Sequence, residues 1–141
     1  MPAGTALRRH WLWALCLYGL GCAPAAPERL IERRSGVATV GEVPASLLAA
    51  AREPIACFGG LVCLADIRLP KESVRAGARA AITYYWVVRG EPGRSWKVFV
   101  HGTVAPGTPH RFSDDRTPLS RAYPMARWRA GDVIKEVRRV P

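Results

Sequence analysis

Residues 79–89 read RAAITYYWVVR, and this stretch decides the fold. Most of its side chains are β-branched or aromatic, which are the types enriched in strands. The apolar side chains do not alternate with polar ones, so both faces of the strand are apolar. Strands of this composition are buried on both sides. The stretch therefore predicts the central strand of a sheet that is covered on each face.

Two neighbouring segments alternate between apolar and polar residues, which is the period of a half-buried strand. In 61–69 (LVCLADIRL), we expect Cys63, Ala65 and Ile67 to share one face. In 96–104 (WKVFVHGTV), we expect the tryptophan and the first two valines to point one way, and the lysine, phenylalanine and histidine the other. Both segments therefore predict strands.

Three further segments complete the expected fold. Residues 36–43 indicate a weak strand, 132–140 a final strand, and 44–52 (PASLLAAAR) a short helix with proline in its first turn. Strands separated by glycine and proline turns are typical of antiparallel sandwiches. The sequence thus predicts an all-β, antiparallel immunoglobulin-like β-sandwich over 36–141, with one short helix before it.

The number of strands falls short of that architecture. About seven are usual, whereas four segments here are clear strands and two are weak. The last strand ends at Pro141, which would leave a sheet edge unpaired. We therefore expect a sandwich that is either incomplete at its C-terminus or closed there by another chain.

Charge restricts the class of partner. The 141 residues include 21 lysines and arginines against 11 aspartates and glutamates, a net charge of +10. Such a charge attracts anionic polymers and lipids non-specifically. The arginines are scattered and no recognition motif accompanies them, so we expect no specific nucleic acid as a partner.

The N-terminus has the layout of an export signal. Two arginines precede an apolar run over 11–21 (WLWALCLYGLG), which is too short to span a bilayer. Residues 1–21 are therefore predicted to be a signal peptide, 22–35 a tether and 36–141 the domain. A buried N-terminal helix is the competing interpretation.

Two cleavage sites are compatible with this signal. Cleavage before Cys22 would make that residue the lipidated start of a bacterial lipoprotein, held at the membrane of the cell envelope. Cleavage after the small-x-small pattern at 23–25 would release a soluble periplasmic or secreted protein. We favour the lipid anchor and keep the soluble form as the alternative.

Cys57 and Cys63 enclose the sequence FGGLV. If the glycines make a hairpin turn, the two sulfurs can face each other and form a disulfide in an oxidising compartment. The alternative is a pair of small apolar core residues. No second cysteine or histidine pair has ligand spacing, so no metal site is predicted.

The stretch 101–115 holds the candidates for catalysis. Asp114 and Asp115 could be paired carboxylates, and His101 and His110 could join Asp115 as metal ligands. Adjacent residues of an extended chain point to opposite sides, however, and aspartates often stabilise turns. We therefore assign no catalytic residue, metal or cofactor, and keep a metal-dependent hydrolase as a distant alternative.

Tyr123, Arg127, Trp128 and Arg129 form the candidate ligand-binding set. Aromatic faces suit sugar C–H groups, and arginines could bind acidic sugars. The competing interpretation is that Trp128 plugs one end of the sandwich while its arginine neighbours stay in solvent. Trp86, in the most apolar strand, is expected in the core.

Spaced motifs run from residue 85 to residue 134. They are Tyr85-Trp86, 96–101 (WKVFVH), 115–118 (DRTP) and 123–134 (YPMARWRAGDVI). In these the chain resembles a β-sandwich module of uncharacterised bacterial envelope lipoproteins, which also forms the C-terminal extracytoplasmic domain of some mannosyltransferase-type membrane glycosyltransferases. The family has a histidine where this chain has Arg116, and it continues into further strands. The resemblance implies a β-sandwich in the cell envelope.

Together these features predict a non-catalytic envelope lipoprotein that serves as an accessory or binding β-sandwich module. Its partner would be a glycan or another envelope protein. The alternative is a carbohydrate-binding module for cell-surface glycans.

Overall fold

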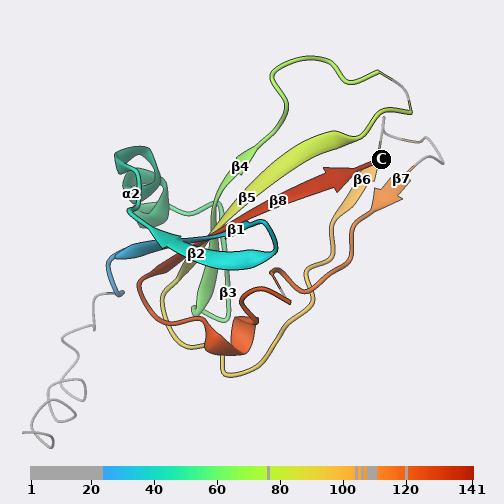
Figure 1. Ribbon diagram of the computed structural model, residues 1–141. Helices are drawn as coiled ribbons and strands as arrows, with labels where there is room; N and C mark the ends of the chain where they lie inside the picture. Colours follow the sequence, from blue (N-terminus) through green and yellow to red (C-terminus); the bar gives the residue numbers. More distant parts are fainter. Residues whose placement is uncertain (1–23, 76, 104, 106, 108–110, 120) are drawn as a thin grey trace, which may run out of the picture.

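The computed structural model describes residues 24–75, 77–103, 105, 107, 111–119 and 121–141. The expected signal peptide, Cys22 and His110 lie outside the described residues. The chain is mostly β-structure: the described part holds a six-stranded sheet, a two-stranded sheet and one α-helix (Figure 1). Within that part, no helix has the length and apolar character needed to cross a membrane.

The six-stranded sheet has the order β2-β1-β8-β5-β4-β3. Its strands are β1 (Arg29–Arg34), β2 (Val37–Gly41), β3 (Ala56–Phe58), β4 (Val62–Arg68), β5 (Ala80–Val88) and β8 (Asp132–Val140). β5 and β8 pair antiparallel along almost their whole length in the middle of the sheet. The central position predicted from residues 79–89 is confirmed.

β1 runs parallel to β8, with Ile31 opposite Ile134. The expectation of a purely antiparallel sheet is therefore wrong at this pair. Parallel strands need a long connection between them, and here the residues between β1 and β8 provide it. The tether expected over 22–35 is wrong from Arg29 onward, since β1 is part of the sheet and Ile31 is buried. The helix also follows two strands instead of preceding the β-structure.

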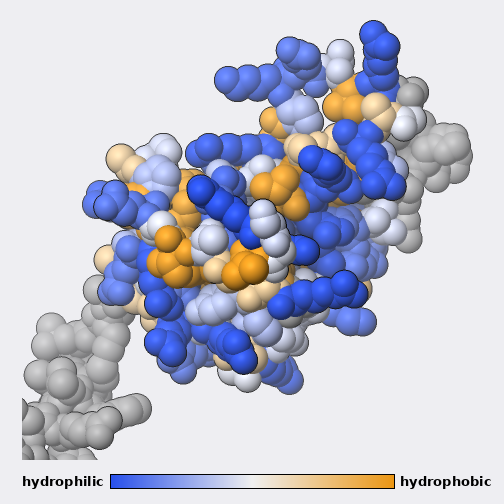
Figure 2. Space-filling model, viewed as in Figure 1, coloured by the Kyte–Doolittle hydropathy of each residue, from blue (hydrophilic) through white to orange (hydrophobic). Residues whose placement is uncertain are grey.

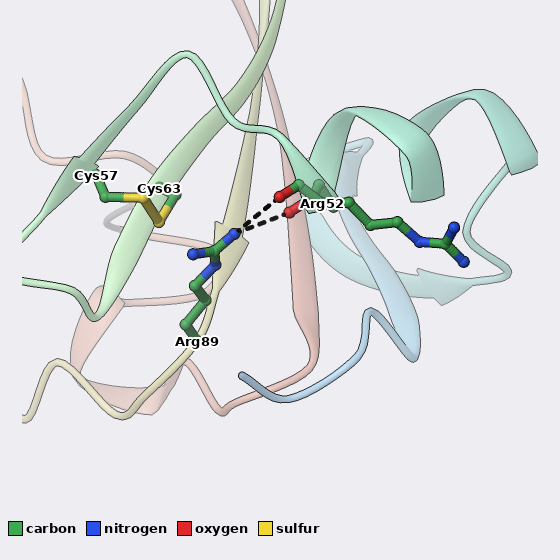
Figure 3. The surroundings of a disulfide bond; sticks show 5 residues. Arg52, Cys57, Cys63 and Arg89 are labelled. Atoms are coloured by element: carbon green, nitrogen blue, oxygen red, sulfur yellow. Dashed lines mark hydrogen bonds between the residues drawn. A yellow bond between two sulfur atoms is a disulfide. The ribbon is translucent and has the colours of Figure 1, made fainter. Parts of the chain in front are cut away.

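The helix α2 (Ala45–Arg52) covers one face of the sheet. Leu47 and Ala51 pack against β4, and against Val87 of β5. The C-terminal end of the helix is held by Arg89, whose Nη2 donates to the carbonyl oxygens of Ala51 and Arg52 at 3.2 and 3.4 Å (Figure 3). Strand β5 therefore anchors the helix directly.

A second layer covers part of the opposite face. Tyr84, Trp86 and Val88 of β5 pack there with Met125 and Trp128. Two short antiparallel strands, β6 (His101–Thr103) and β7 (Arg111–Ser113), continue this layer on the side of the sheet away from α2 (Figure 1). The predicted burial of both faces of β5 is confirmed.

The second layer is less regular than the sequence predicts. Before β6, the segment 96–100 pairs through the isolated bridge between Val98 and Arg116 and through a hydrogen bond from the Asp114 N–H to the Val100 carbonyl oxygen at 2.9 Å. Its alternation is as expected, because Trp96 and Val98 pack against the core while Lys97 and Phe99 are exposed. Since the segment 96–100 is a single extended stretch, it leaves part of the sheet face uncovered.

A β-bulge in β4 moves side chains from one face to the other. The register with β5 shifts between Leu64 and Asp66, so Ala65 is the extra residue. Cys63 packs on the helix side of the sheet, whereas Ile67 lines a cavity on the opposite side. The predicted common face is confirmed for Cys63 and Ala65, which pack together on the helix side, and is wrong for Ile67, because the extra residue reverses the alternation beyond it.

A disulfide joins Cys57 and Cys63 across the β3–β4 hairpin (Figure 3). The two residues are opposite each other in the register, and Gly59 and Gly60 lie in the turn with positive φ. Of the two interpretations of this pair, the structure has the disulfide, and Cys63 is also fully buried. The crosslink holds Phe58 at the end of β3.

Candidate functional site

The structure places the four members of the candidate ligand-binding set on one loop but buries Trp128. Trp128 is only 1% exposed, and its Nε1 donates to the carbonyl oxygen of Tyr123 at 3.0 Å. Because protein covers its ring, Trp128 cannot stack on a sugar, and we correct its role to that of a core residue. Arg127 and Arg129 are exposed, and Tyr123 is half-buried.

Asp132 fixes the loop that carries these residues. Its buried carboxylate accepts a hydrogen bond from Arg29 Nε at 2.6 Å. The backbone N–H of Arg129 and the hydroxyl of Tyr123 donate to it at 3.0 and 3.1 Å. Burial, with the nearby carboxylate, raises the pKa of Tyr123, so the hydroxyl remains a proton donor. The sequence predicted only a turn at Asp132, because Arg29 lies 103 positions away.

A polar hollow of about 570 Å³ lies over this loop. Tyr123, Arg127 and Arg129 line it together with Glu91 and the edge of Trp128. The three polar members of the predicted set therefore do lie together. A ligand here would meet guanidinium groups in place of an aromatic face.

The two adjacent aspartates point to different partners. Asp114 accepts hydrogen bonds from Arg138 and forms an ion pair with Arg116 at 2.9 Å. The hydrogen bond from Arg138 lowers the pKa of Asp114, and the charge of Arg116 contributes to that shift. Asp115 instead lies 3.2 Å from His101 Nε2. The carboxylates diverge, as expected for neighbours in an extended segment.

Arg116 is the centre of a buried charge network. Its Nε and Nη2 donate to the two carboxylate oxygens of Glu136 at 3.0 and 2.7 Å. Its guanidinium carbon lies 4.6 Å from the ring centre of Tyr84. The side chains of Arg116 and Glu136 are 8% and 5% exposed. Arg116 thus connects the second layer to β8.

His101 and Asp115 form a surface pair, with side chains 43% and 41% exposed. Histidine–carboxylate pairs occur in active sites, where a third group or a cleft positions the substrate. Asp115 lines none of the cavities reported above or below, and the described residues contain no group of three or more metal-ligating side chains. We therefore interpret the pair as structural: it connects the start of β6 to the segment that follows β7.

A charged hollow of about 320 Å³ follows the free edge of β8 beyond its pairing with β1. Most of its charges are already paired: Lys135 with Glu32 at 2.9 Å, and Glu136 with Arg116. On the face of the molecule seen in Figure 2, hydrophilic side chains predominate and apolar ones form separate patches. The paired charges of this hollow stabilise the junction of sheet and second layer.

An apolar groove lies where the second layer leaves the sheet uncovered, between β3–β5 and residues 96–101. We call it the interlayer groove, and it has two chambers. The first, about 320 Å³, includes Trp96, Lys97 and Met125. The second, about 450 Å³, includes Ile67, Leu69, Ile82 and His101. Phe58, Trp86, Val98 and Phe99 line both chambers, so the two are continuous.

Trp86 lines this groove and has an unsatisfied polar atom that is itself buried. The residue is 3% exposed, and its buried Nε1 finds no hydrogen-bond partner among the residues that the structure describes. A buried donor without an acceptor costs about 1–3 kcal/mol, and buried polar groups in native proteins are nearly always satisfied. The sequence predicted Trp86 in the core but gave no sign of this atom.

The rim of the groove exposes large apolar side chains to solvent. Phe99 and Leu69 are each 66% exposed, and Phe58 is 46% exposed. The Phe58 ring also contacts Trp86, with 6.3 Å between ring centroids. Apolar side chains clustered beside a cavity indicate a binding surface more strongly than the same residues scattered singly. The interlayer groove is therefore the candidate functional site.

Comparison with known proteins assigns no family. No family model, no curated protein and no solved structure matches the chain. The resemblance to the envelope β-sandwich module remains a prediction that depends on the motif residues 85–134.

Proposed function

We propose that the protein is a non-catalytic binding module of the bacterial cell envelope, anchored through lipid on Cys22, and that it binds an apolar ligand in the interlayer groove. In this proposal the fold is an immunoglobulin-like sandwich whose second layer is reduced to β6, β7 and the segment before them. The reduced layer is what opens the groove.

The observation that carries the proposal is the groove with the unsatisfied Trp86 nitrogen. Its chambers of about 320 and 450 Å³ are in the size range of small-molecule sites. Apart from Lys97, the acidic and basic side chains next to it are engaged in ion pairs that hold the layers together. Binding therefore accounts for the geometry better than acid–base chemistry does.

The Cys57–Cys63 disulfide supports an extracytoplasmic location. Cys57 is exposed, and exposed disulfides persist in oxidising compartments and are rare in the cytosol. This agrees with the export signal expected at residues 1–21. Mass spectrometry of the protein from native membranes tests the anchor, and a mature chain that starts after Ala25 without lipid would contradict it.

Binding can be measured with the neutral fluorescent probe N-phenyl-1-naphthylamine and the full chain carrying Cys22→Ser. We expect saturable enhancement that Phe99→Ser weakens about fivefold or more, because the probe loses an aromatic contact worth roughly 1 kcal/mol or more. Val40→Ser is the matched control, since Val40 is 67% exposed on β2, away from the groove. If Phe99→Ser and Val40→Ser bind the probe equally well, the interlayer groove is not the binding site.

A carbohydrate-binding role is the second candidate, and the polar hollow over the 123–132 loop is what favours it. Arg127 and Arg129 line that hollow from the surface. If the hollow binds acidic glycans, replacing both arginines by alanine abolishes retention on an anionic polysaccharide column while Phe99→Ser does not. Retention that is unchanged in the double variant would exclude this role.

A further inference from the structure

We propose that the ligand of the interlayer groove is a single-chain amphiphile with an anionic end, such as a fatty acid. Its tail lies along the second chamber, and its carboxylate lies in the first chamber near Trp86 and Lys97. The inference depends on the proposed function, since it names the ligand class of the same groove.

The Trp86 indole requires an acceptor in the ligand. An indole N–H only donates hydrogen bonds, so a pure hydrocarbon would fill the groove and leave the nitrogen unsatisfied. A carboxylate oxygen satisfies it with a charge-assisted bond. The nitrogen is itself buried, so side chains around it must move before the carboxylate can reach it, and the nearby rim rings of Phe58 and Phe99 are 46% and 66% exposed.

Lys97 places the charged end in the first chamber. This exposed residue lines that chamber and forms no ion pair with any residue in the described part of the chain. His101, at the second chamber, is already paired with Asp115. The groove thus offers one uncommitted cation, beside the unsatisfied donor.

The second chamber suits the tail. Ile67, Leu69 and Ile82 line it, and the β-bulge in β4 is what brings Ile67 to this face. Because the chamber is open along the exposed edge of β4, tails of different length can lie in it. A single acyl chain matches one continuous groove better than a flat or branched apolar body would.

The test is displacement of bound N-phenyl-1-naphthylamine from the full-length Cys22→Ser chain, with competitors below their micelle concentrations. Dodecanoate should displace the probe at a concentration about tenfold lower than methyl dodecanoate, because only the acid pairs with Lys97. Dodecyltrimethylammonium, with the same tail and the opposite charge, should be the weakest competitor.

Two variants distinguish the contribution of the Trp86 hydrogen-bond donor from that of the Lys97 charge. Lys97→Met should remove the preference for acid over ester, and Trp86→Phe should weaken both, because the ester also carries an acceptor. Arg94→Met is the control, since Arg94 is an exposed cation that lines neither chamber. A near-ultraviolet circular dichroism spectrum checks that Trp86→Phe keeps its packing, and the Lys97→Met result stands alone if it does not.

The outcomes distinguish the two proposals. Probe binding without displacement by dodecanoate, or equal displacement by all three competitors, overturns the fatty-acid assignment and leaves the binding module in place. Displacement by an apolar peptide alone, or loss of probe binding as the chain self-associates, also overturns it. If the probe does not bind at all, both proposals fail.

Discussion

Replacing Arg116 by methionine should destabilise the fold more than any other single change in its charged residues. The substitution keeps an unbranched apolar stem but removes the guanidinium group and with it both hydrogen bonds to Glu136. Asp114 retains Arg138 as a partner, whereas Glu136, 4% exposed, has no other ion pair among the described residues. The variant therefore leaves one buried carboxylate uncompensated.

The size of the effect follows from that single buried charge. Removing one partner of a buried ion pair costs about 3–5 kcal/mol, whereas replacing both partners by apolar residues is often close to neutral. We therefore expect Arg116→Met to lower the free energy of unfolding by about 3–5 kcal/mol. The double variant Arg116→Met with Glu136→Met should recover most of that loss, to within about 1–2 kcal/mol of the parent chain.

Urea unfolding followed by tryptophan fluorescence measures both variants in the full chain carrying Cys22→Ser. Arg68→Met is the matched control, because Arg68 pairs with Asp66 at the surface, with side chains 51% and 33% exposed. Loss of such a pair changes stability by about 0.5 kcal/mol or less. If the double variant is as unstable as Arg116→Met alone, the penalty does not come from the orphaned carboxylate, and the reasoning is refuted.

Three further predictions concern the loops and the pH range. Gly131→Ala should lower the free energy of unfolding by about 1–2 kcal/mol in urea titrations, because φ is +91° and the new Cβ would lie 3.2 Å from the Ala26 carbonyl oxygen; an unchanged midpoint would contradict this. Reducing the Cys57–Cys63 disulfide with dithiothreitol should cost about 2 kcal/mol in the same assay, as the closed loop is short. The pKa of Asp114 is lowered in the folded state, so its contribution to stability is present above the ordinary value of 3.8 and is lost as the pH falls through the folded value. Melting temperatures should therefore begin to fall below about pH 4, and Asp114→Asn should reduce that fall.

The strands with strong local patterns could be predicted from the sequence, and the pairings between distant segments could not. Residues 79–89 and 132–140 became β5 and β8 because β-branched and aromatic side chains identify a buried strand wherever it lies. β1 reads RLIERR, and only Ile31 of its residues is buried. From the sequence alone, the charged residues of β1 are typical of a tether. In the structure Arg29 pairs with Asp132 and Glu32 pairs with Lys135, so these charges hold β1 against β8.

The candidate site was hidden for a similar reason. Sequence patterns placed Trp86 in the core and Trp96 and Val98 on one face of a strand, and all three do pack in or against the core. A groove arises, however, only where one layer fails to cover another, and no local pattern reports incomplete cover. The β4 bulge was equally hidden. The sequence LVCLADIRL alternates regularly between apolar and polar residues, but in the folded strand the extra residue turns the side chains after it to the opposite face of the sheet.

The placement of β8 has a consequence for how the protein is made. β2 and β1 on one side, and β5, β4 and β3 on the other, are connected in the sheet only through β8. Translation delivers residues 132–140 after all of these strands, so the sheet cannot be completed until β8 has left the ribosome. Folding then waits for pairings between distant positions, which are slow to form. Until β8 pairs with them, β1 and β5 each keep a free edge that another chain could join, so this interval is when the molecule is most exposed to aggregation.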